Sequence, residues 1–221
     1  MRGARDVEEP SQVAALQQAS RTLAGSIERA KAVQDVDVLR GLEGEAAGVY
    51  FGVFDSLITA GKSDFCFKGR NRRPPLDPVN ALLSFLYTLL AHDTTSAVAG
   101  VGLDSAVGFL HTDRPGRPSL ALDIMEEFRA MLADRVALSL INRRQVRADG
   151  FEKTASGAVE MDAATRKEVL SAWQKRKQEE MVHPFLEERI PVGLAVHVQA
   201  MLLARYLRGD IDAYPAVIWR G

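Results

Sequence analysis

Residues 108–129 read GFLHTDRPGRPSLALDIMEEFR, and this stretch decides the architecture. A proline-rich loop over 112–118 has no helical pattern, because proline removes a backbone donor and fixes φ. The longest helix of the chain is predicted directly after it, from Ser119 to about Arg147. We therefore expect a long central helix that directly follows a proline-rich loop.

Three acidic side chains share one broad face of this helix: Asp123, Glu126 and Glu127. They adjoin an apolar stripe, which consists of Leu120, Ile124 and Phe128. Carboxylates beside a buried stripe need a cation or hydrogen-bond partners. On this helix alone, the alternative is that Glu126 and Glu127 are solvated and that Asp123 pairs with an arginine.

Two further residues are placed to join these carboxylates. His111 ends an apolar run, and the loop after it is short enough to bring the imidazole back onto the first turns of the helix. Glu43 lies between Gly41 and Gly44 in a helical pattern, where each glycine costs about 0.5–1 kcal/mol and so favours close packing or a close ligand. Carboxylates and one imidazole suit Mg²⁺ or Mn²⁺, the imidazole favouring Mn²⁺. The alternatives are a core histidine and a surface glutamate.

Apolar spacing along the rest of the chain predicts an all-α, multi-helix fold, in which residues 148–160 form a small β-hairpin or an irregular loop. Residues 1–36 are expected to form an N-terminal linker and helix, and residues 37–221 one helical domain. The other predicted helices cover 37–59, 78–91, 95–99, 162–182 and 191–207.

The net charge of −1 gives no overall sign of a nucleic-acid partner, so local clusters have to carry that argument. Two clusters of cations stand out: Lys68, Arg70, Arg72 and Arg73 in a loop over 61–76, and Arg114 and Arg117 after His111. Such clusters suit contacts to phosphates that do not depend on base sequence. Solvated loop charges are the alternative.

Cysteine content and hydropathy point to the cytoplasm. A single cysteine, Cys66, excludes an intramolecular disulfide and fits a reducing compartment. No unbroken apolar run reaches the roughly 18 residues of a membrane helix. The charged N-terminus is not followed by an apolar segment, so no secretory signal is expected.

A Glu-x-x-His spacing at Glu180 and His183 is typical of helical bundles that bind two metal ions. Those bundles need two such motifs, and the sequence has one. Pro184 also ends the helix directly after His183. A two-metal bundle is therefore a weaker hypothesis than the single mixed site.

Several motifs in collinear order, from about Leu39 to Trp219, resemble one known family. These motifs are GLEG over 41–44 with Tyr50-Phe51, RNRRPPLDPVNALLS over 70–84, the stretch 108–129, and LARYLRGD over 203–210. They are similar to the helical catalytic domain of the CRISPR-associated spacer-acquisition integrases. The sequences of these motifs are most similar to those of members from type I systems, subtype C.

The resemblance implies a metal-dependent DNA endonuclease and integrase that inserts protospacer DNA into a CRISPR array in antiviral defence. It implies one Mn²⁺ or Mg²⁺ per chain, with Glu43, His111 and Glu126 as ligands. Asp123 matches a further acidic position, which is expected to orient the nucleophile or to accept its proton. Residues 37–221 are then the catalytic domain, without the β-rich N-terminal domain that members usually carry.

The implied partners are double-stranded and branched DNA, a small ferredoxin-like CRISPR adaptation protein, an iron–sulfur CRISPR nuclease in some type I systems, and a second copy in the full-length family. Asn80 and Tyr87, on the helix after the basic loop, are either DNA contacts or buried polar residues with local partners. The alternative function is a truncated, non-catalytic helical module that binds DNA or a partner protein.

Overall fold

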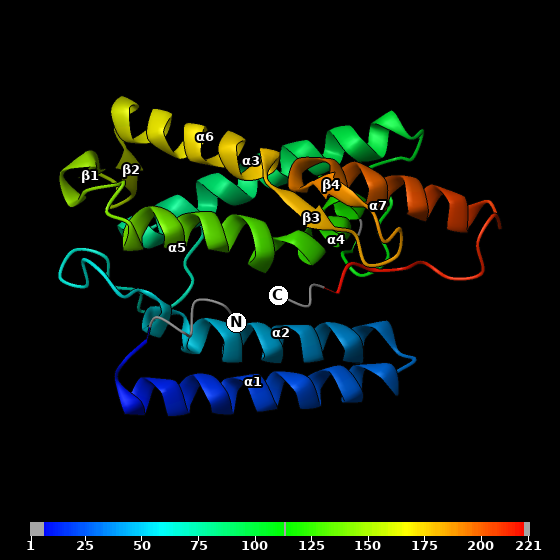
Figure 1. The fold of residues 1–221 in the computed structure, drawn as a ribbon, viewed down its shortest axis with the longest axis horizontal. Helices are drawn as coiled ribbons and strands as arrows, with labels where there is room; N and C mark the ends of the chain where they lie inside the picture. The colour runs from blue at the N-terminus through cyan, green and yellow to red at the C-terminus, as the bar shows by residue number, and fades with distance from the viewer. Residues whose placement is uncertain (1–6, 113, 219–221) are drawn as a thin grey trace. The chain divides into compact units, whose positions relative to one another are not determined.

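The computed structural model describes residues 7–112 and 114–218, which form two units that alternate along the chain (Figure 1). The first unit takes the residues up to Ala81 together with Ile141–Met161, and the second takes Leu82–Leu140 and the residues from Asp162 onward. Within the described ranges, no helix combines the length and the apolarity that crossing a bilayer requires.

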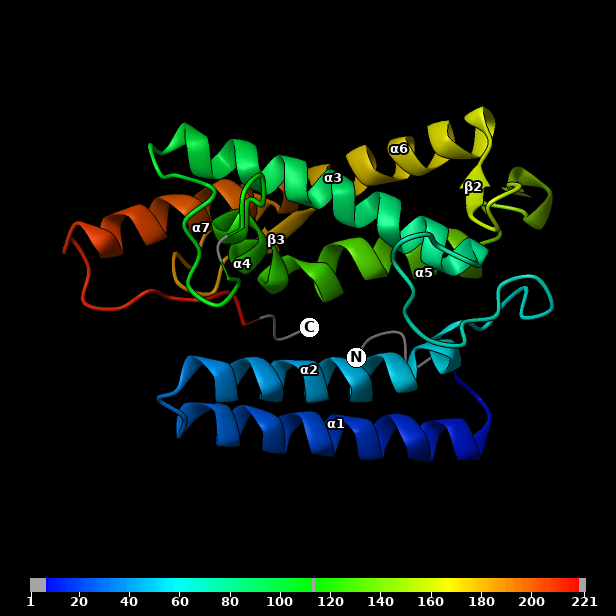
Figure 2. The ribbon, with the colours of Figure 1, turned by 180° about the vertical axis from the view of Figure 1, so that it is seen from behind.

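Two long helices run side by side at the start of the first unit (Figures 1 and 2). They are α1, Pro10–Lys31, and α2, Val36–Gly52. The first begins at a proline, whose fixed φ suits the first helical position. The second is capped by Asp35, whose carboxylate accepts hydrogen bonds from the backbone N–H groups of Asp37 at 2.7 Å and Val38 at 3.2 Å. The helix predicted over 37–59 begins close to its expected start but ends earlier, at Gly52.

The rest of the first unit joins segments that lie far apart in sequence. A short 3₁₀ helix, η2, spans Phe54–Leu57. The side chain of Asn142 closes onto it, donating to the carbonyl of Leu57 and accepting from the N–H of Thr59, both at 2.9 Å. The ring of Phe65 meets the ring of Phe151 edge-on at 5.8 Å between centroids. One amide and one aromatic pair thus hold residues near 60 to residues near 145.

A small antiparallel hairpin completes the first unit. It follows the 3₁₀ turn η4, Ala148–Gly150, and consists of β1, Phe151–Lys153, and β2, Val159–Met161. The N–H of Val159 also donates to the carbonyl of Pro75 at 2.8 Å, which attaches the hairpin to the basic loop. The hairpin predicted near 148–160 is confirmed.

The second unit is a helical layer with one further hairpin. Its core includes several of the largest fully buried side chains, among them Phe128, Leu132 and Trp173. Helix α7 packs on α6 and on α4. The elements are α3 (Pro78–Gly100, which begins in the first unit), α4 (Ser119–Phe128), the π-helical turn η3 (Arg129–Ala133), α5 (Asp134–Asn142), α6 (Ala163–Gln178), β3 (Glu180–Val182), β4 (Arg189–Pro191) and α7 (Val192–Leu207).

Two predicted helices have different limits in the structure. The segments 78–91 and 95–99 form one helix, α3, within which the hydroxyls of Thr94 and Thr95 donate to carbonyls one turn earlier. The helix predicted over 119–147 is interrupted by η3 and ends at Asn142.

The all-α prediction is only approximate, because a second hairpin was missed. The helix predicted to reach Val182 ends at Gln178, and residues 180–182 pair with 189–191 in antiparallel register. Met181 and Ile190 are buried opposite each other, whereas their strand neighbours are exposed. The alternating pattern of a half-buried strand thus prevails over the helical propensity of the charged run before it.

Candidate metal centre and nucleic-acid interface

Asp123 gathers the loop before α4 around a single carboxylate. One oxygen accepts the N–H groups of Phe109 at 2.5 Å and Leu110 at 3.1 Å, and the other accepts the N–H of His111 at 2.9 Å. The imidazole Nδ1 of His111 lies 2.7 Å from that second oxygen. Because an ionised carboxylate only accepts, Nδ1 carries a proton, and in the neutral imidazole Nε2 is then the ring nitrogen with a lone pair. The prediction that His111 folds back onto the first turns of this helix is confirmed.

Gly108 is required by this arrangement. A Cβ there would lie 2.7 Å from the Cβ of Ser119, 2.9 Å from the carbonyl oxygen of His111 and 3.0 Å from the carboxylate of Asp123. Two of these atoms belong to the backbone or to a short buried side chain, so they have little freedom to move. The glycine that opens the motif therefore gives the loop room to approach α4.

Glu126 is held by an arginine one turn later. The guanidinium of Arg129 donates to both carboxylate oxygens, at 2.6 Å and 2.7 Å, and lies 4.4 Å from the ring centre of Tyr87. The hydroxyl of Tyr87 in turn donates to the buried Asp134 at 2.5 Å. Burial, and then the charge of Asp134, raise the pKa of Tyr87, so the phenol remains a donor. Glu126 is thus fixed through a chain of three residues.

Glu127 points to other partners than its neighbour. Its carboxylate accepts from Gln199 at 2.9 Å, from the hydroxyl of Tyr214 at 2.5 Å and from the N–H of Val217 at 2.7 Å. The alternative in which Asp123 pairs with an arginine is therefore wrong, since the arginine partner belongs to Glu126. Glu127 is not simply solvated either. No signal in the sequence links it to Tyr214 or Val217, which follow it by almost ninety residues.

Glu43 lies on α2 in the first unit, whereas His111, Asp123 and Glu126 belong to the second. Its side chain is exposed. A Cβ at Gly41 or Gly44 would meet no described atom within 4 Å, so the first unit shows no close packing at these glycines. Across residues 7–112 and 114–218, no three His, Cys, Asp or Glu side chains form a metal-binding group.

The donor chemistry of the second unit nevertheless fits a divalent cation. Metal-ligating histidines almost always donate the second ring N–H to a carboxylate or carbonyl, which fixes the tautomer and the ring orientation. His111 has this arrangement with Asp123, and its side chain is 21% exposed. Glu126 offers carboxylate oxygens on the same helix as Asp123 and is 30% exposed. These two residues match the borderline-hard ligands of Mn²⁺.

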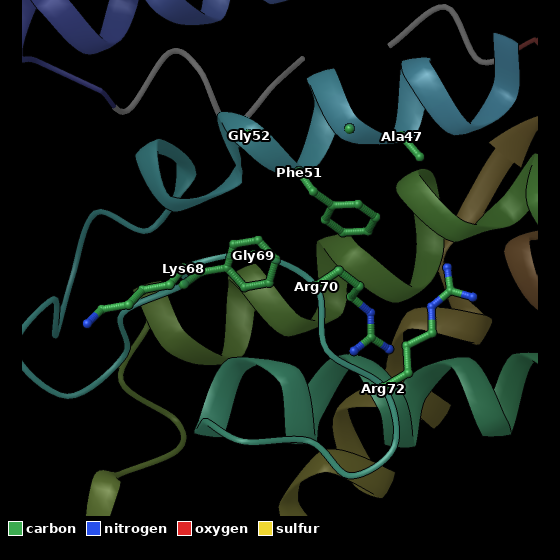
Figure 3. A pocket seen from close by; sticks show the side chains of 9 residues that line it. Ala47, Phe51, Gly52, Lys68, Gly69, Arg70 and Arg72 are labelled. Carbon is green, nitrogen blue, oxygen red and sulfur yellow. The ribbon is translucent and has the colours of Figure 1, made fainter. Parts of the chain in front are cut away.

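The basic loop forms one wall of a pocket in the first unit (Figure 3). The pocket has a volume of about 490 Å³. The other wall is α2, whose small residues leave space beside the ring of Phe51. No carboxylate lines it, and three cations do. The lining residues are Ala47, Gly48, Phe51, Gly52, Phe67, Lys68, Gly69, Arg70 and Arg72.

Asn80 holds this loop in place and is fully buried. Its side-chain oxygen accepts from Arg70 at 2.7 Å and from the N–H of Asn71 at 3.0 Å. Its amide nitrogen donates to the carbonyl of Gly69 at 2.9 Å and to Asp77 at 2.7 Å. Of the two readings left open by the sequence, the structure thus gives Asn80, like Tyr87, a set of local partners.

The remaining predicted cations are accessible to solvent. Lys68, Arg72 and Arg73 are exposed, and Arg70 is half-buried. In the second unit, Arg114 is exposed and Arg117 is half-buried, both on the loop that follows His111.

The two-metal hypothesis fails at His183. This residue is fully buried and lies after β3 rather than on a helix. Its Nε2 bonds to Gln199 at 3.0 Å, and its Nδ1 accepts the N–H groups of Phe185 and Leu186 at 3.3 Å and 3.2 Å. Because both ring nitrogens are occupied, His183 has none left for a metal.

Comparisons with known proteins show the family of the chain. A family model described as CRISPR associated protein Cas1 matches residues 1–175. The chain is 65% identical over 85% of its length to CRISPR-associated endonuclease Cas1 2 of Rhodospirillum rubrum, of which it covers 54%. It is 56% identical over 99% of its length to CRISPR-associated endonuclease Cas1 1 of Chlorobaculum tepidum, of which it covers 64%. It is 42% identical over 99% to CRISPR-associated endonuclease Cas1 of Leptospira interrogans, of which it covers 86%. The chain thus spans between half and two thirds of the first two relatives.

Solved structures share the fold. A Cas1 protein from Thermotoga maritima superposes with a TM-score of 0.76 at 25% identity, over 94% of this chain and 64% of that one. A chain of a Cas6-RT-Cas1–Cas2 complex gives 0.80 at 26% identity, over 99% of this chain and 23% of that one. A casposase bound to an integration product gives 0.79 at 23% identity, over 96% and 60%, which is a likeness of fold alone.

Proposed function

This chain belongs to the CRISPR associated protein Cas1 family, and we propose that it carries the metal-dependent endonuclease and integrase chemistry of CRISPR adaptation. The observation that carries the proposal is the imidazole of His111, which is hydrogen-bonded to Asp123, a residue of the same helix, α4, as Glu126. Relatives named endonucleases support the reaction class. We also propose that the chain belongs to a type I system of subtype C.

We propose Glu43, His111 and Glu126 as ligands of one Mn²⁺ or Mg²⁺, with Mn²⁺ favoured by the imidazole. A cation held there would supply Lewis-acid polarisation of the scissile phosphodiester. The protein's own contribution is to present Nε2 of His111 in one tautomer and to hold the carboxylate of Glu126 through Arg129.

Asp123 is better suited to positioning than to proton transfer. An ionised carboxylate has about four acceptor sites, and four donors from residues 109–111 already occupy those of Asp123. Accepting a proton from the nucleophile would require it to release one of them. We therefore propose that Asp123 orients His111 and leaves the nucleophile, a DNA 3′-hydroxyl or water, to other groups.

The basic loop is proposed as a contact for double-stranded and branched DNA. Lys68, Arg72 and Arg73 are exposed, and the pocket beside them lacks carboxylates, which suits phosphate oxygens. The same role is proposed for Arg70, Arg114 and Arg117. Asn80 and Tyr87 would act indirectly, by holding the loop and Arg129 in place.

Relatives indicate the kinds of partner. One solved assembly is named as a Cas6-RT-Cas1–Cas2 complex, and a Geobacter sulfurreducens relative is named as a Cas4 exonuclease/Cas1 endonuclease fusion. For this chain we propose a small ferredoxin-like adaptation protein, an iron–sulfur nuclease and a second copy as partners. The family-based expectation of a homodimer applies to the full-length protein.

The test is strand cleavage or joining on branched, integration-like DNA in Mn²⁺. We expect activity in the wild type and its loss with chelator or with Glu126→Ala, while Glu160→Ala on the exposed face of β2 keeps it. If the chain binds Mn²⁺ but shows no activity, a partner protein or another domain must supply a component that the reaction needs. No activity and no Mn²⁺ binding would contradict the catalytic proposal and favour a helical binding module.

A further inference from the structure

The C-terminal segment after α7 returns to α4 (Figures 1 and 2). Two residues fix it there: the hydroxyl of Tyr214 and the N–H of Val217 both donate to Glu127, at 2.5 Å and 2.7 Å. The side chain of Val217 is buried. The segment has no regular secondary structure of its own over 211–218, so these contacts largely determine its path.

Gln199 on α7 is the hub of the contact and is fully buried. Its amide nitrogen lies within hydrogen-bond distance of Glu127, the Tyr214 hydroxyl at 2.8 Å and the Pro215 carbonyl at 3.2 Å. Its oxygen faces Nε2 of His183 at 3.0 Å. An amide whose both ends are engaged at a buried position has a fixed orientation.

His183 connects this hub to the turn between β3 and β4. Because Nδ1 accepts the N–H groups of Phe185 and Leu186, the ring proton lies on Nε2 and is donated to Gln199. The backbone of His183 also pairs with Glu187 and Glu188, each at 2.9 Å. A continuous hydrogen-bonded relay therefore runs from the hairpin turn through α7 to α4 and the C-terminal segment.

The end of α4 needs such support. The helix has only ten residues, and the π-helical turn η3 begins directly after Phe128, so the regular α-helical ladder is interrupted just beyond Glu126. At its other end, α4 is tied to the preceding loop by Asp123. Arg129, which holds Glu126, itself lies in the π-helical turn. An external anchor at Glu127 compensates for this interruption.

We propose that Glu127 is a positioning residue, and that the relay His183–Gln199–Glu127–Tyr214 fixes the last turn of α4 and with it the carboxylate of Glu126. The inference rests on the proposed metal site, to which it adds the C-terminal segment as a structural component. Burial, and then the charge of Glu127, raise the pKa of Tyr214, which keeps the phenol protonated as a donor.

The experiment measures Mn²⁺ affinity of the intact chain by calorimetry, together with amide hydrogen exchange over 123–129. Tyr214→Phe removes one hydroxyl, and Gln199→Leu removes the hub. We expect about five-fold weaker Mn²⁺ binding for the first, a larger loss for the second, and faster exchange in both. Glu127→Gln combined with Tyr214→Phe should lose no more affinity than the worse single variant, because both act through one contact.

Thr94→Val is the matched control, since the buried hydroxyl of Thr94 bonds only to the carbonyl of Leu90 within α3. It should lower the melting temperature without changing Mn²⁺ affinity. Relay variants that lower the melting temperature but leave both the affinity and the exchange over 123–129 unchanged would overturn the inference. If the wild type binds no Mn²⁺, the proposed function fails, and the exchange data alone decide whether the relay holds α4.

Discussion

Two loops of this molecule are each held by one polar side chain of the helix that follows, but the side chain is charged in one loop and neutral in the other. In each, one polar side chain near the start of a helix binds the backbone of the loop that precedes it: Asp123 binds residues 109–111, and Asn80 binds residues 69–71. The first anchor is an anion that only accepts, so it orients N–H groups and an imidazole. The second is a neutral amide that donates and accepts, so it adds no negative charge to a loop rich in cations.

This difference in charge separates the loop proposed to bind a metal ion from the loop proposed to contact DNA. The carboxylate of Asp123 engages Nδ1 of His111 and leaves Nε2 for the cation proposed above. The amide leaves Lys68 and Arg72 without a neutralising charge from their anchor, an environment that suits phosphate. We therefore propose that the choice between Asp and Asn at the anchor sets the kind of ligand that each loop favours.

The largest expected effect comes from removing the charged anchor. Asp123→Ala leaves three backbone N–H groups and the ring N–H of His111 without their acceptor, and we expect a loss of about 4 kcal/mol in the free energy of unfolding. Mn²⁺ binding should be lost as well. Urea unfolding and calorimetry measure both. Asp123→Asn is the sharper variant, because its –NH₂ cannot accept; full stability in that variant would contradict the role assigned to the carboxylate.

Removing the neutral anchor should cost less. Asn80→Ala breaks the bonds to Gly69, Asn71 and Arg70, and we expect about 3 kcal/mol of destabilisation by urea unfolding. Asn80→Asp tests the comparison directly, since it places a second carboxylate beside Asp77. That variant should also weaken DNA binding in a filter assay at low salt. Unchanged DNA affinity in Asn80→Asp would show that DNA binding does not depend on a neutral side chain at this position.

The two loops also differ in why they contain glycine. A side chain at Gly108 would clash with neighbouring atoms. A side chain at Gly69 would meet no described atom, but the φ there is +130°, a conformation that other residues rarely adopt. We expect Gly108→Ala to destabilise by about 2 kcal/mol through crowding and Gly69→Ala by about 1 kcal/mol through backbone strain. Thermal unfolding of both variants checks the order. The reverse order would mean that the loop before α4 can move away from Ser119.

The smallest effect on stability is expected at the exposed cations. Lys68→Ala and Arg72→Ala should each change the free energy of unfolding by less than about 0.5 kcal/mol. Each should nevertheless reduce the slope of log DNA affinity against log salt by about one. Exposed Lys167→Ala on α6 serves as the control and should leave the slope unchanged. Equal slopes in all three variants would remove the basic loop from the proposed interface.

Sequence reasoning was successful where the partners are close in the chain. The pairing of His111 with the acidic helix followed from the short proline-rich loop, and the hairpin was one of the two structures expected near 148–160. It failed where partners are distant: Glu127 depends on Tyr214 and Val217, and no local periodicity reports such a contact. The hairpin of β3 and β4 was missed because a charged helical run masks a three-residue strand.

The π-helical turn after α4 fixes the helical phase of the segment that follows. Buried positions recur every four residues from Leu120 to Leu140, at Leu120, Ile124, Phe128, Leu132, Val136 and Leu140. In an uninterrupted α-helix each such step would drift by about 40°, and the stripe would turn almost to the opposite side over this length. The extra residue in η3 sets the phase back by about 100° and returns the later positions to the core. The π-helical turn therefore absorbs one residue without turning α5, and a one-residue deletion within η3 should leave a regular α-helix whose later positions still face the core.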